Sequence, residues 1–311
     1  MTKVRLVTGG AGFIGSHLVE SLLAGGERVR VLDNFSTGRR SNLASAHPLL
    51  EIVEGDVADV GAVTAAMAEV EIVYHLAAVA SVQQSLEDPL GTHRVCATGT
   101  LNVLNAARQS GVGRLVYAAS ASAYGIPTND VQTENDPVCP LSPYGVAKLT
   151  GEHYARAFAT SFGMETVCLR FFNVFGARQL ADNPYSGVIA IFTGAMLAGR
   201  RPCILGDGRQ SRDFVYVADV VQALTRAAQA SDVAGKVFNV GTGKGTDLLE
   251  LVAVLNRILG LHIQPEFGPP RKGDIRHSRA DISRIRQELK YQPAITFEEG
   301  LRHTVEWYKG R

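Results

Sequence analysis

The fold is decided near the N-terminus by the stretch Val4-Arg-Leu-Val-Thr-Gly-Gly-Ala-Gly-Phe-Ile-Gly15. Its apolar first half predicts a strand, and apolar residues at helical spacing over Gly12–Ala24 predict a helix directly after it. Glycines at such a junction let the backbone turn tightly against a pyrophosphate, which the N–H groups and dipole of the helix then bind. A purely structural glycine turn is the alternative, and the strand–helix context argues against it. We expect a dinucleotide site whose turn contains Gly9, Gly12, Phe13, Ile14 and Gly15.

A carboxylate follows at the distance that a dinucleotide site requires. Asp33 ends a second expected strand, Val29–Asp33, roughly 20 residues beyond the turn. A carboxylate there accepts hydrogen bonds from both adenosine ribose hydroxyls and repels a 2′-phosphate, so the predicted cofactor is NAD. Arg39 and Arg40 are a counter-signal that favours NADP, although arginines in a polar loop are more often solvated.

Strand-length apolar runs alternate with helical patterns along the first half of the chain. Such alternation predicts a Rossmann-type, doubly wound parallel α/β sheet with helices on both faces. We expect an NAD-binding domain over residues 1–175. Its further strands and long helices are expected at Ile52–Glu54, Ile72–His75, Thr92–Ser110, Leu115–Ala119, from Tyr144 to Ser161, and at Thr166–Phe172.

The pattern changes after Phe172, where glycine, proline and polar loops separate shorter elements. This change predicts a smaller mixed α/β lobe over residues 176–311 that binds the substrate. Two brief runs, Phe214–Tyr216 and Val237–Val240, are expected to return to the main sheet, so that residues 214–241 rejoin the first domain.

The composition excludes several classes of protein. The 311 residues include 31 basic and 30 acidic side chains, for a net charge of +1, which gives no global field for nucleic acid or an acidic membrane. No apolar run approaches the roughly 20 residues of a membrane span, and no signal peptide is apparent. Four dispersed cysteines without a CxxC pair, and no cluster with metal-ligand spacing, predict neither disulfides nor a metal site. We expect a cytoplasmic protein that binds no metal, nucleic acid or membrane.

A tyrosine and a lysine stand one helical turn apart in Tyr144-Gly-Val-Ala-Lys148. The ammonium is expected to lower the pKa of the phenol toward neutrality and make it a usable acid and base. Such a pair often arises by chance, and it is the position of Ser120 that supports a catalytic role for this one. Because it follows the expected strand Leu115–Ala119, where ligands gather in open α/β sheets, it can share a hydrogen bond with Tyr144 and a substrate oxygen.

Together these motifs resemble the extended short-chain dehydrogenase/reductases, and among them the UDP-glucose and UDP-N-acetylglucosamine 4-epimerases. The likeness covers nearly the whole chain. It is carried by Thr8–Gly15, His75-Leu-Ala-Ala78, Ser120 with Tyr124-Gly125, Ser142–Lys148, Arg170-Phe-Phe-Asn173, Gly206–Asp213, Asn239–Gly243, Arg271–Asp274 and Ser278–Asp281.

The resemblance implies a catalytic triad of Ser120, Tyr144 and Lys148, a bound NAD, and a homodimer paired through a four-helix bundle of the two long helices. Besides the glycine turn and Asp33, it implies cofactor contacts from Asn34, Asp56, Val57, Leu76, Ala77, Ala78, Tyr144, Lys148 and Phe171. It implies UDP-sugar contacts from Ser81, Ser120, Ser122, Tyr144, Asn173, Val188, Arg212, Arg271, Asp274 and Ser278. Arginines suit a diphosphate because their planar forks bind its oxygens in pairs.

Two residues bear on the reaction. Sugar 4,6-dehydratases of this family carry an Asp-Glu pair where this chain has Ala121 and Ser122, and neither of these side chains can act as an acid. We therefore expect C4 epimerisation of a UDP-hexose through a 4-keto intermediate. A TDP- or UDP-sugar 4,6-dehydratase or reductase is the alternative enzyme, and an NAD-sensing binding protein is the alternative without catalysis.

Four further positions bear on the site. The small Ser278 is implied to lie beside the sugar C2 substituent, which predicts that N-acetylated UDP-hexoses are accepted. Cys96 replaces an asparagine that usually orders the cofactor, and Leu205 replaces an aromatic residue against the nucleotide base. His75, at a strand end, is expected to be a hydrogen-bonded structural residue.

Overall fold

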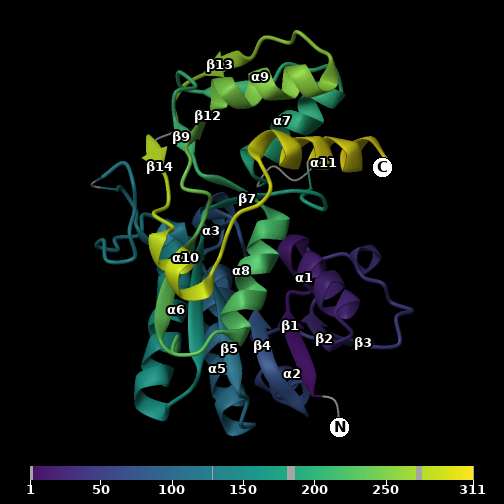
Figure 1. Cartoon of the computed structure of the whole chain (residues 1–311), viewed down its shortest axis with the longest axis vertical. Coiled ribbons are helices and arrows are strands. Elements are labelled where there is room, and N and C mark those ends of the chain that lie inside the picture. Colours follow the sequence, from purple (N-terminus) through teal and green to yellow (C-terminus); the bar gives the residue numbers. More distant parts are fainter. Residues whose placement is uncertain (1–2, 128, 181–185, 271–274, 311) are drawn as a thin grey trace.

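A seven-stranded parallel sheet forms the centre of the protein in the computed structural model, which describes residues 3–127, 129–180, 186–270 and 275–310 (Figure 1). The strand order is β11-β6-β5-β4-β1-β2-β3, and all neighbours run parallel. Because the order reverses between β1 and β4, the ligand crevice is expected at the carboxyl ends of these strands. The strands are β1 (Val4–Thr8), β2 (Arg28–Asp33), β3 (Leu50–Glu54), β4 (Val70–His75), β5 (Arg114–Ser120), β6 (Thr166–Phe171) and β11 (Lys236–Val240).

Helices cover both faces of this sheet, which confirms the predicted Rossmann-type architecture. One face packs against α1 (Phe13–Ala24), α8 (Val217–Gln229) and α10 (Ser283–Leu289), and the other against α2 (Val60–Ala66), α5 (Gly99–Gln109) and α6 (Pro143–Phe162). Since successive strand residues point to opposite faces, Val116 packs into the first core and Leu115 into the second. Burial on both faces explains why the strands read as apolar runs without alternation.

The helix predicted over Thr92–Ser110 is interrupted. A short helix, α4 (Pro89–His93), leads into the π-helical turn η2 (Arg94–Thr98), which continues as α5. Such π-turns within helices occur mostly at functional sites. The remaining short helices here are α3 (Val82–Glu87) and the 3₁₀ turns η1 (Arg40–Asn42) and η3 (Ala121–Ala123).

A smaller mixed lobe lies above the carboxyl ends of the sheet in Figure 1. It contains α7 (Val188–Leu197), α9 (Leu248–Leu259) and α11 (Phe297–Lys309). Its short strands are β7 (Asn173–Phe175), β8 (Cys203–Leu205), β9 (Ser211–Arg212), β10 (Phe214–Tyr216), β12 (Thr246–Asp247), β13 (Glu266–Gly268) and β14 (His277–Ser278). A separate core built around Phe175, Phe214 and Phe297 holds the lobe together.

The chain passes between the two lobes more than once. β11 joins the edge of the main sheet beside β6, as expected for Val237–Val240. The expectation that Phe214–Tyr216 also joins that sheet is wrong, because β10 pairs in parallel with β7 as a separate two-stranded sheet. Phe214 and Tyr216 of β10 enter the core of the smaller lobe, whereas Val215 packs into the first core of the main sheet. No helix of the described residues is both long and apolar enough to span a membrane.

Candidate active site

The glycine turn between β1 and α1 has a geometry that side chains would block. Gly9 has a φ of +69°, and a Cβ there would lie 2.8 Å from the backbone of Ala77. A Cβ on Gly15 would lie 2.2 Å from the Gly9 carbonyl oxygen. Gly12 is the N-cap of α1, and among the described residues no side chain caps this helix end. The first N–H groups of the helix are therefore available to an anion, as a pyrophosphate requires.

Asp33 is held firmly beside this turn. The side chain is 7% exposed, and its two carboxylate oxygens accept hydrogen bonds from the Ala11 N–H at 2.9 Å and the Phe35 N–H at 2.8 Å. The lone pairs that remain on each oxygen can accept ribose hydroxyls. Arg40, the counter-signal for NADP, pairs with Glu54 and stacks its guanidinium 4.2 Å over the Phe35 ring. The residues present therefore fit NAD.

The other residues assigned to the cofactor lie at the same edge of the sheet. Asn34 donates to the Asp56 carboxylate at 3.4 Å, and the carbonyl of the buried Val57 accepts from Asn102 at 3.1 Å. The segment Leu76–Ala78 follows β4 directly, and the Leu76 N–H donates to the Thr8 carbonyl at 3.2 Å. This bond sets the segment against the glycine turn.

Ser120 and Tyr144 meet at the carboxyl end of β5. Ser120 is the last residue of that strand and lies in register with Phe171, the last residue of β6. The Ser142 hydroxyl caps α6 by accepting from the Gly145 N–H at 3.1 Å, which places Tyr144 in the first turn of the helix. The Ser120 side chain lies near enough to the Tyr144 phenol to lower its pKa. The two groups predicted to share a substrate oxygen are thus adjacent.

Lys148 lies one turn farther along α6 and is 4% exposed. Its ammonium stands 4.8 Å from the centre of the Tyr117 ring, and burial lowers its pKa. Burial also raises the pKa of Tyr144, while the nearby Ser120 side chain opposes that rise. The expectation that Lys148 brings the Tyr144 pKa toward neutrality is therefore not met in the protein alone, because desolvation of the phenolate outweighs the local polar contacts.

The residues assigned to the nucleotide sugar come from several elements of both lobes. Arg212 and Ser278 are register partners in the parallel pair of β9 and β14. Ser122 follows in η3, where its N–H donates to the Ser120 hydroxyl at 3.1 Å. Ser81 caps α3, Asn173 begins β7 and Val188 begins α7. Arg271 and Asp274 lie outside the described residues.

Asp213 organises the surroundings of Arg212 and was not singled out from the sequence. Its fully buried carboxylate accepts hydrogen bonds from the backbone N–H groups of Thr242, Gly243 and Ala280 and from the Thr242 hydroxyl, at 2.7 to 3.1 Å. Asp213, the residue directly after Arg212, therefore fixes the positions of two loops, one at Thr242–Gly243 and one at Ala280. The signal in the sequence was a carboxylate directly before the apolar strand Phe214–Tyr216.

Cys96 and Leu205, the two departures from the family pattern, have defined contacts or burial in the structure. Cys96 lies in the π-turn η2 at 1% exposure, packs with Ala147 of α6, and its sulfur accepts from the Val79 N–H at 3.3 Å. The thiol thus retains one backbone hydrogen bond at this position. Leu205 ends β8 and is half-buried.

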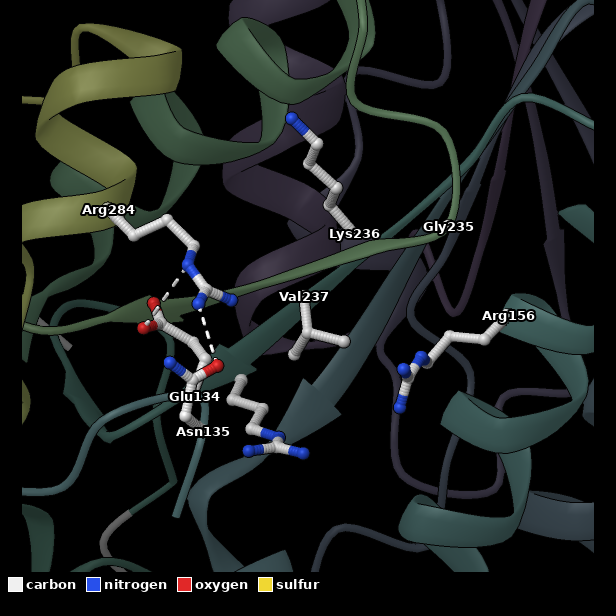
Figure 2. Close-up of a pocket in the computed structure, with 8 residues that line it drawn as sticks. Glu134, Asn135, Arg156, Gly235, Lys236, Val237 and Arg284 are labelled. Atoms are coloured by element: carbon white, nitrogen blue, oxygen red, sulfur yellow. Dashed lines mark hydrogen bonds and ion pairs between the residues drawn. The ribbon is translucent and has the colours of Figure 1, made fainter.

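A separate pocket of about 220 Å³ lies beside the edge strand β11 (Figure 2). Two of its cations are held by local partners: Arg170 forms a bidentate pair with Glu152 at 2.8 and 2.7 Å, and Arg284 contacts Glu134 and Asn135. We interpret it as a structural junction, since it contains none of the residues assigned to cofactor or substrate. Its lining residues are Glu134, Asn135, Arg156, Arg170, Gly235, Lys236, Val237 and Arg284.

Known proteins share both the sequence and the fold. The model of the NAD dependent epimerase/dehydratase family matches residues 5–241. The UDP-glucose 4-epimerase of Mycolicibacterium smegmatis is 42% identical over 313 residues, covering 98% of each chain. The solved UDP-N-acetylglucosamine 4-epimerase from Methanobrevibacter ruminantium, in complex with UDP-N-acetylmuramic acid, gives a TM-score of 0.95 at 36% identity, covering 99% of this chain and 98% of that one. The Thermus thermophilus UDP-glucose 4-epimerase complex with NAD gives 0.90 at 38% identity, covering 99% of both.

Proposed function

The chain belongs to the NAD-dependent epimerase/dehydratase family, and we propose that it inverts C4 of a UDP-hexose through a transient 4-keto sugar. The observation that carries this proposal is that Ser120, at the carboxyl end of β5, is adjacent to Tyr144, at the same edge of the sheet where the glycine turn follows β1. Bound NAD supplies a reversible hydride acceptor there. Side chains of this protein carry out the proton transfer and bind the sugar oxygen.

Tyr144 acts as the base and then as the acid. Its phenolate takes the proton of the sugar 4-hydroxyl while C4 gives up hydride, which leaves a ketone at C4. After the ketone turns over and hydride returns to its opposite face, Tyr144 returns the proton to the oxygen. Ser120 hydrogen-bonds the same oxygen throughout. Because burial raises the Tyr144 pKa, the phenolate needs a cation to stabilise it, and Lys148 on the same helix would supply that charge, assisted by NAD when it is bound.

The residues beside Ser120 favour epimerisation over elimination. Ala121 and Ser122 form the turn η3 directly after β5, where a dehydratase would need a carboxylic acid to remove water from the 4-keto sugar. Neither side chain ionises at working pH. The alternative, a TDP- or UDP-sugar 4,6-dehydratase or reductase, would release a 4-keto product or consume a reduced cofactor.

We infer that the enzyme also accepts UDP-GlcNAc and UDP-GalNAc. Ser278 is half-buried and is the register partner of Arg212, the residue that we propose binds the diphosphate. A serine leaves more space for an acetamido group than a bulky side chain would. Arginine at this point suits a diphosphate because its donors bind two oxygens at once.

We further propose a homodimer formed through α5 and α6. Large apolar side chains are exposed on α6 and on the neighbouring short helices, including Val146 at 50%, Leu86 at 57% and Leu90 at 82%. Contiguous apolar surface of this kind commonly marks a protein interface. Sedimentation at several protein concentrations tests the proposal, and Leu90→Asp should then shift the protein toward monomer.

Product analysis separates the candidate reactions. The enzyme, loaded with NAD and given no reductant, is incubated with UDP-glucose, UDP-GlcNAc or TDP-glucose, and the products are identified by NMR. The proposal expects the 4-epimers of the two UDP-sugars. A 4-keto-6-deoxy sugar would instead assign the protein to the dehydratases, and recovery of all three substrates unchanged would reject catalysis.

A further inference from the structure

His75 is a buried histidine that is not among the residues assigned to cofactor or substrate. It lies at the centre of a continuous series of hydrogen bonds. We propose that His75 is a positioning residue, which fixes the helix bearing Tyr144 and Lys148 relative to the cofactor turn. This inference rests on the proposed epimerase reaction and adds three residues to its machinery: Thr8, His75 and Thr100.

This series of hydrogen bonds connects three elements of the fold. His75 ends β4, and its Nδ1 lies 2.7 Å from the Thr8 hydroxyl at the end of β1. Its Nε2 lies 3.0 Å from the Thr100 hydroxyl in α5, which donates to the Cys96 carbonyl at 2.7 Å. At the other end, the Ala77 N–H donates to the Thr8 hydroxyl at 3.3 Å. Thr8, His75 and Thr100 are each at most 1% exposed.

The direction of every proton in this chain follows from counting donors. The Thr100 hydroxyl has one proton, which the Cys96 carbonyl accepts, so its oxygen must accept from the His75 Nε2–H. The Nδ1 of a neutral imidazole is then an acceptor, and it takes the proton of the Thr8 hydroxyl. A neutral ring agrees with its burial, which together with the charge of Lys148 lowers the His75 pKa to about 3. One tautomer therefore satisfies every member of the chain.

Both ends of the chain reach functional backbone. Thr8 immediately precedes Gly9. The backbone of Ala77 packs so closely against Gly9 that a Cβ at position 9 would lie 2.8 Å from it. Cys96 lies in the π-turn η2 and packs against Ala147, between Tyr144 and Lys148 on α6. The cofactor turn and the catalytic helix are thus joined through rigid, fully buried contacts.

A second contact links His75 to the same helix. The imidazole stacks on the Tyr117 ring with centroids 5.7 Å apart, and the Tyr117 hydroxyl donates to the Lys148 carbonyl at 3.1 Å. The Lys148 ammonium also rests over this ring. A change in the chain would therefore move Lys148 and Tyr144 relative to the cofactor while leaving the residues assigned to the nucleotide diphosphate in place. Small displacements of reacting groups are costly to rate.

The test replaces one hydroxyl with a methyl group of similar shape. Thr100→Val breaks the hydrogen-bond chain between His75 and Cys96, and Thr304→Val is a matched control. Thr304 is also 1% exposed, and its hydroxyl also donates at 2.7 Å to the carbonyl four residues earlier, but it lies in α11 without a histidine partner. Both variants and the wild type are loaded with NAD. Their kcat and KM for UDP-glucose, bound NAD and melting temperatures are then measured.

The proposal expects Thr100→Val to lower kcat by about tenfold, with KM changed less than about twofold. Thr304→Val should keep the wild-type kcat even if its melting temperature falls as far. Thr100→Ser, which restores the hydroxyl, should recover most of kcat. Equal kcat for the two valine variants, or no recovery with serine, would overturn the positioning role. An inactive wild type would instead overturn the proposed function.

Discussion

Arg212 and Ser278 stand opposite one another in the parallel pair of β9 and β14, although a long stretch of sequence separates them. β12 pairs with the other edge of β9, so the Arg212 strand is the middle one of three. Ser278 itself lies on the outer strand β14, directly beside Arg212. We propose that the size of the side chain at position 278 controls the space for the sugar C2 substituent.

Ser278→Tyr should lower turnover of UDP-GlcNAc about tenfold more than turnover of UDP-glucose, because the ring takes the space of the acetamido group. Steady-state rates with both sugars measure the ratio. Ser278→Ala, which adds no bulk, is the control and should leave the ratio unchanged. Equal losses with both sugars after Ser278→Tyr would contradict the placement of this residue.

Tyr144→Phe removes the phenolic proton carrier and keeps the ring. We expect kcat to fall by about 10²- to 10⁴-fold, the usual contribution of a general acid–base group, with bound NAD unchanged. Tyr154→Phe on the same helix is the control, since Tyr154 is 38% exposed. Near-normal activity of Tyr144→Phe would show that another group moves the proton.

Asp33→Asn removes the negative charge beside the glycine turn. The variant should bind NAD about tenfold more weakly and discriminate less against NADP, because the repulsion of a 2′-phosphate is gone. Titration of both dinucleotides onto stripped protein measures this. Asp59→Asn, at the exposed N-cap of α2, should change neither affinity.

Glu152→Gln leaves the Arg170 guanidinium buried without its counter-charge. Both side chains are nearly inaccessible, at 1% and 4% exposure, so the free energy of unfolding should fall by about 3–5 kcal/mol. Urea unfolding of the two proteins measures the loss. Glu298→Gln breaks exposed ion pairs with Arg257 and Arg302, and the comparable loss there should stay below about 1 kcal/mol.

The buried His75 makes stability depend on pH. Its pKa is about 3 in the folded protein against 6.5 ordinarily, so between these values the unfolded chain binds a proton that the folded protein does not. Stability therefore falls as pH drops below 6.5, with a slope of up to about 1.4 kcal/mol per pH unit from this group. His75→Gln should flatten the curve of unfolding free energy against pH, whereas the exposed His262→Gln should not. Parallel curves for His75→Gln and the wild type would argue against a neutral buried imidazole.

Local patterns in the sequence predicted the main sheet and the first site well. Six of its strands and the turn at Gly9–Gly15 depend on residues adjacent in the chain, and their limits differ from expectation by only a few residues. The structure brings Ser120 and Tyr144 near each other, because strand ends and helix starts meet at one edge of a parallel sheet, and their shared role in catalysis stays a prediction.

Features that depend on distant partners were not predictable in this way. Phe214–Tyr216 has the composition of a buried strand, but the choice of β7 over the main sheet is made by packing around Phe175. The π-turn at Cys96 leaves no local signal. The pKa of Tyr144 rises because the folded chain desolvates it, and a count of neighbouring charges in the sequence omits that effect.

The return of β11 to the edge of the main sheet has a consequence for how the protein loses its structure. The strand Lys236–Val240, which completes the first core, follows part of the smaller lobe in the sequence. The helix α10, which comes later still, packs over the same sheet. Neither lobe is a continuous piece of chain that can be cut away intact. Thermal denaturation should accordingly appear as one cooperative transition, and a fragment ending near residue 213 should fail to form a stable dinucleotide-binding unit.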